Sequence, residues 1–132
     1  VHLASADYDP PSELKAKNFS TVSPIRLPNL LRSIVIEHAG QEELILHIDC
    51  GAFAFMAHDE SEKLAFSSEY IEDVFSSLAI ARDTKAAAAI TIVFPRLGRG
   101  GEATLQRLAY FLRTTLGIIV PVCDDELPAG NV

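Results

Sequence analysis

The segment Arg96-Leu97-Gly98-Arg99-Gly100-Gly101 combines two cationic side chains with three glycines. It follows a β-branched apolar segment and precedes an amphipathic one, the position at which open α/β sheets bind ligands. Backbone N–H groups at a helix start attract anions, and glycine lets a phosphate approach the backbone closely. We therefore predict that any small anionic ligand binds at a site made by Arg96, Gly98, Arg99, Gly100 and Gly101.

The alternative interpretation of this segment is a flexible turn before a helix. Its glycine spacing matches neither the dinucleotide-binding fingerprint nor the P-loop, and no Lys-Ser/Thr pair follows. Glu102 falls in the first turn of the expected helix, where its carboxylate repels an anion. Binding is therefore expected to be weak.

Cys50 is the candidate nucleophile, because it comes directly after an apolar segment that reads as a central strand. Asp49-Cys50-Gly51 resembles the strand-ending Asp-x-Cys-x-Gly type segment of caspase-like hydrolases, and residues 1–5 resemble their earlier strand. The resemblance implies a cysteine hydrolase or transferase. In such an enzyme the amides of residues 98–101 would stabilise an oxyanion.

The chain departs from the caspase-like pattern where the catalytic histidine belongs. Ala6-Asp7 stands in place of His-Gly, and no spacing marks another histidine as the general base. A reduced cysteine at the end of an apolar run is more often core filler. This favours a buried structural thiol at Cys50.

A second resemblance covers the carboxyl-terminal third of the chain. Gly100-Gly101, a helix to Leu116, a strand at 118–122 and Pro128-Ala129-Gly130 follow the order found in the Clp-protease/crotonase superfamily. That family has its serine nucleophile where this chain has Pro128. The resemblance implies a degenerate site or a fragment of that fold.

Metal and cofactor chemistry has little support in the sequence. Acidic pairs such as Asp59-Glu60 and Asp124-Asp125 are solvated segments by composition, and His47 within an apolar strand is expected to be hydrogen-bonded in the core. Neither Cys50 nor Cys123 has a zinc-type spacing. We predict no metal site, and the sequence names no cofactor.

Composition and charge narrow the class of partner. The 132 residues are 48% hydrophobic and carry a net charge of −7, which disfavours nucleic acid and anionic membrane surfaces. No apolar run approaches the ~20 residues of a membrane-spanning helix, so we expect a soluble protein. Two cysteines are too few for a disulfide framework, which favours the cytoplasm and leaves an exported protein with one disulfide open.

The elements that position these residues follow from hydrophobic periodicity. Apolar side chains at helical spacing predict helices at 28–39, 69–82 and 101–116, with Ser68 as an N-cap. Apolar β-rich runs predict strands at 43–49, 53–57, 90–94 and 118–122, and charged residues predict a solvated turn at 58–63. The run at 43–49 is nearly continuous in apolar side chains, which is typical of a strand covered on both faces. The β-branched run at 90–94 predicts a buried strand.

This order predicts one α/β domain, a layered sandwich with a four- to five-stranded mixed or partly parallel sheet and about three helices. Residues 89–122 should form a strand–helix–strand crossover. We expect an extended arm at 1–26, the α/β domain at 27–123 and an acidic tail at 124–132.

The sequence favours a small non-enzymatic interaction or assembly module, because it offers no nucleophile–base pair and no complete cofactor motif. Its expected partner is another protein or a second copy, paired through the arm at 1–26 or the apolar strand with Phe53, Phe55 and Met56. The anion binder and the Cys50 hydrolase or transferase remain the alternatives.

Overall fold

The computed structural model describes residues 12, 22–59, 62–94 and 101–120. Three α-helices lie within them, α2 (Leu27–Glu37), α3 (Ser68–Asp83) and α4 (Glu102–Leu116). The strands are β1 (Leu44–Asp49), β2 (Ala54–Met56), β3 (Glu62–Leu64) and β4 (Ala87–Val93). Two 3-10 helices, η1 (Pro24–Arg26) and η2 (Cys50–Phe53), complete the described elements.

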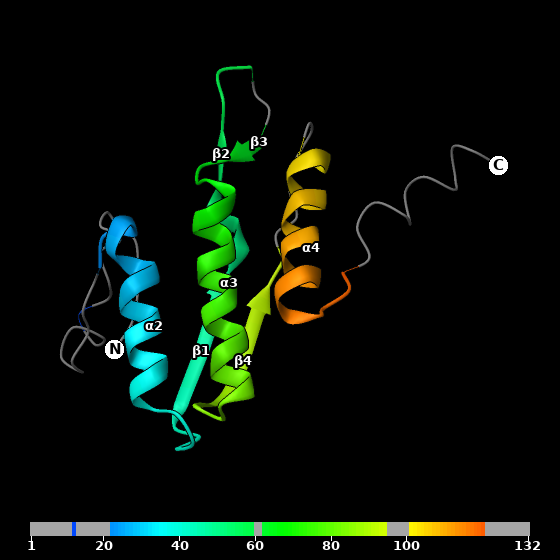
Figure 1. Ribbon diagram of the computed structural model, residues 1–132. Helices are drawn as coiled ribbons and strands as arrows, with labels where there is room; N and C mark the ends of the chain where they lie inside the picture. Colours follow the sequence, from blue (N-terminus) through cyan, green and yellow to red (C-terminus); the bar gives the residue numbers. More distant parts are fainter. Residues whose placement is uncertain (1–11, 13–21, 60–61, 95–100, 121–132) are drawn as a thin grey trace.

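The strands form two separate pairs. β1 and β4 are parallel, with Leu46 opposite Ile90 and Ile48 opposite Ile92, and α3 lies between them in the chain. β2 and β3 form an antiparallel hairpin in which Phe55 lies opposite Lys63. The hairpin projects beyond the amino-terminal ends of α3 and α4 (Figure 1).

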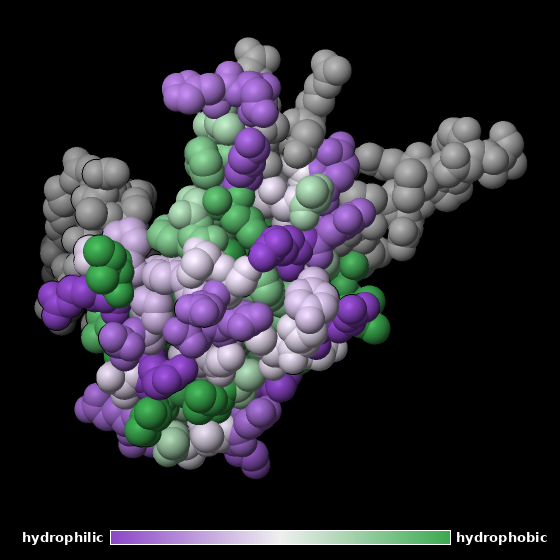
Figure 2. Space-filling view, turned by 45° about the horizontal axis from the view of Figure 1, so that its top comes forward, coloured by the Kyte–Doolittle hydropathy of each residue, from purple (hydrophilic) through white to green (hydrophobic). Residues whose placement is uncertain are grey.

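The helices make one layer beside the β1–β4 sheet. α3 lies over the two strands and runs antiparallel to them, with α2 and α4 on either side of it (Figure 1). Because it is central, α3 contributes the largest share of the core, the buried side chains of Ile71, Val74, Phe75, Leu78 and Ala81. Hydrophilic residues cover much of the outer surface of this layer, and hydrophobic surface gathers at the base of the hairpin (Figure 2).

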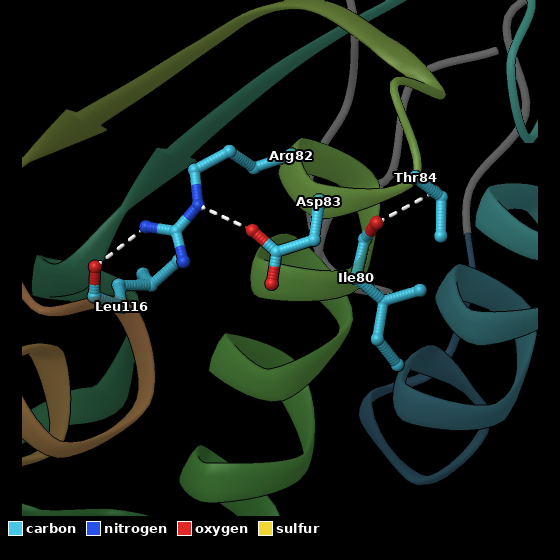
Figure 3. Close-up of polar contacts among 5 residues, drawn as sticks. All are labelled: Ile80, Arg82, Asp83, Thr84 and Leu116. Atoms are coloured by element: carbon cyan, nitrogen blue, oxygen red, sulfur yellow. Dashed lines mark hydrogen bonds and ion pairs between the residues drawn. The ribbon is translucent and has the colours of Figure 1, made fainter.

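Both ends of α3 are fixed by polar contacts. At the amino end the Ser67 hydroxyl accepts a hydrogen bond from the Tyr70 N–H at 3.2 Å. At the carboxyl end the Arg82 guanidinium donates to the Leu116 carbonyl oxygen at 2.6 Å and to Asp83 at 2.9 Å (Figure 3). The first of these Arg82 contacts joins α3 to the end of α4, where Gly117 adopts the left-handed conformation with φ +69°.

The helix predictions are confirmed to within one or two residues. The N-cap of α3 is Ser67, one residue before the predicted Ser68. The strands predicted at 43–49 and 53–57 correspond to β1 and β2, although Phe53 itself belongs to η2. The predicted turn at 58–63 was wrong at Glu62 and Lys63, which lie in β3 even though their charges are typical of a solvated loop.

The mixed α/β class is confirmed, but the sheets are smaller than predicted. The part of the chain that the structure describes has two sheets of two strands, because η2 separates β1 from β2 and β2 pairs with β3 instead of joining the β1–β4 sheet. Residues 118–120 have no regular structure, and residues 121–122 lie outside the described residues. The observed crossover is therefore β1–α3–β4 and not the unit predicted at 89–122.

The three-part division of the chain stays a prediction. Most of residues 1–26 and all of 124–132 lie outside the described residues, and Pro24–Arg26 forms η1.

Candidate functional site: the open face of the β1–β4 sheet

On one face of the β1–β4 sheet, no helix of residues 22–59, 62–94 and 101–120 lies over the strands. The side chains of this face are those of Ile45, His47 and Asp49 on β1 and of Ala89, Thr91 and Val93 on β4, and all six residues are exposed. Ile45 keeps 77% of its surface exposed and Val93 keeps 40%. They lie at opposite ends of the face, because Ile45 pairs with Ala89 and Asp49 pairs with Val93.

The opposite face of the same strands is the covered one. Leu46 and Ile48 of β1 and Ile90 and Ile92 of β4 pack against the buried core, to which α3 contributes most. Because side chains alternate along a strand, burial of this face turns the neighbouring residues outward. The prediction that the strand at 43–49 is covered on both faces was therefore wrong, and so was the prediction that His47 lies in the core. The strand predicted as buried at 90–94 is covered on one face only.

The carboxyl end of β1 holds Asp49 and Cys50. Asp49 Oδ1 accepts a hydrogen bond from the Gly51 N–H at 2.9 Å, which starts η2 and turns Cys50 inward. Cys50 is fully buried as a free thiol. Its burial, and secondarily the negative charge of Asp49, raise the pKa of the thiol to about 12.

A cysteine nucleophile acts as the thiolate, and the surroundings of Cys50 favour the neutral thiol. The geometry therefore gives the hydrolase or transferase interpretation no support, and that interpretation stays a prediction. Cys123, the other cysteine, lies outside the described residues.

Most of the predicted anion site also lies outside the described residues, namely Arg96, Gly98, Arg99 and Gly100. Its last residue, Gly101, is the N-cap of α4 and makes no side-chain cap.

An open groove of about 440 Å³ lies at the starts of α3 and α4. Lys63 from β3, Ser67 and Ser68 from the start of α3, and Arg107 from α4 are among its lining residues. The Arg107 guanidinium donates a hydrogen bond to the Ser68 hydroxyl at 2.6 Å, and Lys63 Nζ lies 3.8 Å from Asp59 Oδ2. Sequence reasoning missed Lys63 and Arg107, because only the fold brings them together at the starts of α3 and α4.

Among residues 22–59, 62–94 and 101–120, no three His, Cys, Asp or Glu side chains gather as a metal-binding group. No helix of that same part of the chain is long and apolar enough to cross a membrane.

Comparison with known proteins identifies no relative. No family model, no curated protein and no solved structure matches the chain. The resemblances to caspase-like hydrolases and to the Clp-protease/crotonase superfamily thus receive no support from these comparisons.

Proposed function

We propose that this protein is a non-enzymatic interaction module whose open β1–β4 face binds another protein. The observation that carries the proposal is the uncovered face itself. Parallel sheets occur almost only with both faces covered, because the strands of βα units bury apolar side chains on each side. Here Ile45 and Val93 face outward from a parallel pair.

The composition of the strands supports the same proposal. β4 has no charged residue over seven positions, and Asp49 is the single acidic residue in β1. Exposed strands are usually protected by charged side chains, and this pair is almost without them. A partner that covers the face would remove the exposed apolar surface of Ile45 and Val93 from water.

The hairpin supplies a second exposed apolar element. Phe55 and Met56 keep 48% and 66% of their surface exposed, whereas Phe53 is buried and packs edge-on against Phe75 at 5.8 Å. Of the strand proposed from the sequence, Phe55 and Met56 are therefore accessible to a partner, and Phe53 anchors the hairpin to the core.

A different protein fits the open face better than a second copy does. Two copies would bring together two chains that each carry a net charge of −7, and these chains would repel one another.

Site-specific photo-crosslinking tests the proposal. A photoreactive phenylalanine analogue replaces Ile45 on the open face or Ile36, which is 61% exposed on α2. In cells that make the protein, the label at position 45 should attach to a different protein and the label at 36 should not. That protein, purified, should bind the wild type at least tenfold more tightly than Ile45→Asp. Equal products at both positions, or equal binding by the variant, would overturn the proposal.

A second candidate function is the binding of a small anion at the start of α4. Two observations support this function. The N-cap of α4, Gly101, provides no side-chain hydrogen bond to the helix start, and the groove at this end of α4 is lined by Lys63 and Arg107. Titration with inorganic phosphate and with nucleotides, followed by amide chemical shifts, should move Gly101 and the groove residues first. Arg107→Gln should weaken binding, and the matched control Arg32→Gln on α2 should not. Shifts elsewhere, or equal binding by both variants, would exclude this site.

A further inference from the structure

We infer that the occupant of the open face is one amphipathic α-helix of the partner, with basic residues flanking its apolar stripe. This inference rests on the proposed function and names the partner's chemistry. It follows from the width, the side chains and the charge of the face.

The width of the face fits one helix. Neighbouring strands lie about 4.8 Å apart and a helix with its side chains is about 10 Å across, so one helix covers two strands. α3 already covers this same pair on the other side (Figure 1). The six residues of β1 extend roughly 20 Å, which a helix of about 13 residues matches.

The side chains of the face suit an apolar stripe better than a polar surface. Ile45 stands beside the small Ala89 at one end, and Val93 provides apolar surface at the other. His47 and Thr91 form the middle pair and offer hydrogen-bonding groups there. A helix presents apolar residues at intervals of three and four, which matches apolar contacts at the two ends of the face.

The charge of the face indicates a basic partner. Asp49 is the one acidic residue on the face, and its hydrogen bond to Gly51 holds the carboxylate at the carboxyl end of β1. The chain as a whole has a net charge of −7. A helix that runs antiparallel to the strands, as α3 does, places its positive dipole end near Asp49.

Two stapled peptides of 14 residues serve as probes, one built from Leu and Lys and its counterpart from Leu and Glu. The full-length protein should bind the Lys peptide with an affinity that falls at least tenfold in Ile45→Asp and about threefold in Asp49→Asn. The control variants Ile36→Asp and Asp83→Asn, both in the helix layer, should bind as the wild type does. The Glu peptide should bind at least tenfold more weakly.

Equal losses in the Ile45 and Ile36 variants, or equal binding of both peptides, would overturn the inference. The product of the crosslinking experiment at position 45 distinguishes failure of the helix inference from failure of the proposed function. If the label attaches to a strand or to an acidic segment of another protein, the helix inference is wrong and the proposed function still holds. A product within this chain or with a second copy refutes both.

Discussion

The two faces of the β1–β4 sheet share one backbone and have opposite surroundings. On one face Leu46, Ile48, Ile90 and Ile92 pack against the core beneath α3. On the other, Ile45 is 77% exposed. Adjacent residues of the same strand are therefore expected to contribute to different properties. The covered residues contribute to the stability of the chain, and the open residues, under our proposal, contribute to the binding of a partner.

The comparison shows that hydrophobicity alone does not place a residue in the core. Ile45 and Leu46 are neighbours of nearly equal hydrophobicity, and the direction of each side chain decides whether it is buried. A substitution on the covered face should therefore change the free energy of unfolding, and one on the open face should change binding.

The largest effect is expected in the core under the covered face. Phe75 is fully buried and packs against Phe53, so Phe75→Ala should lower the free energy of unfolding by about 3–5 kcal/mol. Denaturant unfolding measures this change. A loss below about 1 kcal/mol would mean that the α3 core is not packed as described.

Leu108 of α4 provides a second test of the same layer. Leu108→Ala should cost about 2–5 kcal/mol, because this side chain is also fully buried. Tyr110 is 52% exposed on the same helix, and Tyr110→Ala should cost clearly less. If the two variants are equally stable, α4 does not pack as the structure describes.

The raised pKa of the buried Cys50 thiol predicts that the free energy of unfolding falls at alkaline pH. The unfolded thiol loses its proton near pH 9, and the folded thiol keeps it until about pH 12. The folded state therefore binds more protons in this window. The stabilisation is complete below pH 9 and is lost as the pH rises toward 12, at up to about 1.4 kcal/mol per pH unit.

Unfolding measured across this window should show a steeper alkaline loss for the wild type than for Cys50→Ala. Thiol reagents at pH 7 should modify Cys50 only after unfolding, in a Cys123→Ser background. Rapid labelling of the folded protein would revive Cys50 as a nucleophile and contradict its burial.

The N-cap of α3 gives a smaller effect. Ser67→Ala removes the hydroxyl that accepts from the Tyr70 N–H and should cost about 1 kcal/mol. Ser68→Ala removes only the contact with Arg107 and should cost less. Thermal unfolding of the pair measures the difference. A larger loss of stability in Ser68→Ala than in Ser67→Ala would mean that Ser68 is the N-cap, as predicted from the sequence.

The smallest effect is expected on the open face. Thr91 is exposed in the middle of β4, and Thr91→Val keeps its shape and its β-branched character. The free energy of unfolding should change by no more than about 0.5 kcal/mol. A larger loss would mean that Thr91 has a partner within the folded chain.

The sequence predicts the helices well because each has a long apolar stripe and clear ends. Pro28 lies in the first turn of α2, and Gly117 ends α4 in the left-handed conformation. β1 was recognised, but continuous apolar runs do not reveal which face lacks a covering layer. That depends on how many strands pair, which is a property of the whole fold.

The candidate site was harder to predict than the fold. The glycines and arginines of residues 96–101 predict an anion site, but most of these residues lie outside the described part of the chain. The open face carries no motif, because Ile45, Thr91 and Val93 are ordinary strand residues in sequence. Arg107 and Ser68 are 39 positions apart, and their contact depends on the packing of α4 against α3.

Two substitutions one residue apart show whether the β1–β4 sheet has one covered face and one open face. Ile45→Asp places a carboxylate on the open face and should leave the free energy of unfolding within about 0.5 kcal/mol of the wild type. Leu46→Asp places the same group against the core beneath α3 and should cost more than about 3 kcal/mol or prevent folding. Equal costs, or a larger cost at Ile45, would contradict the account.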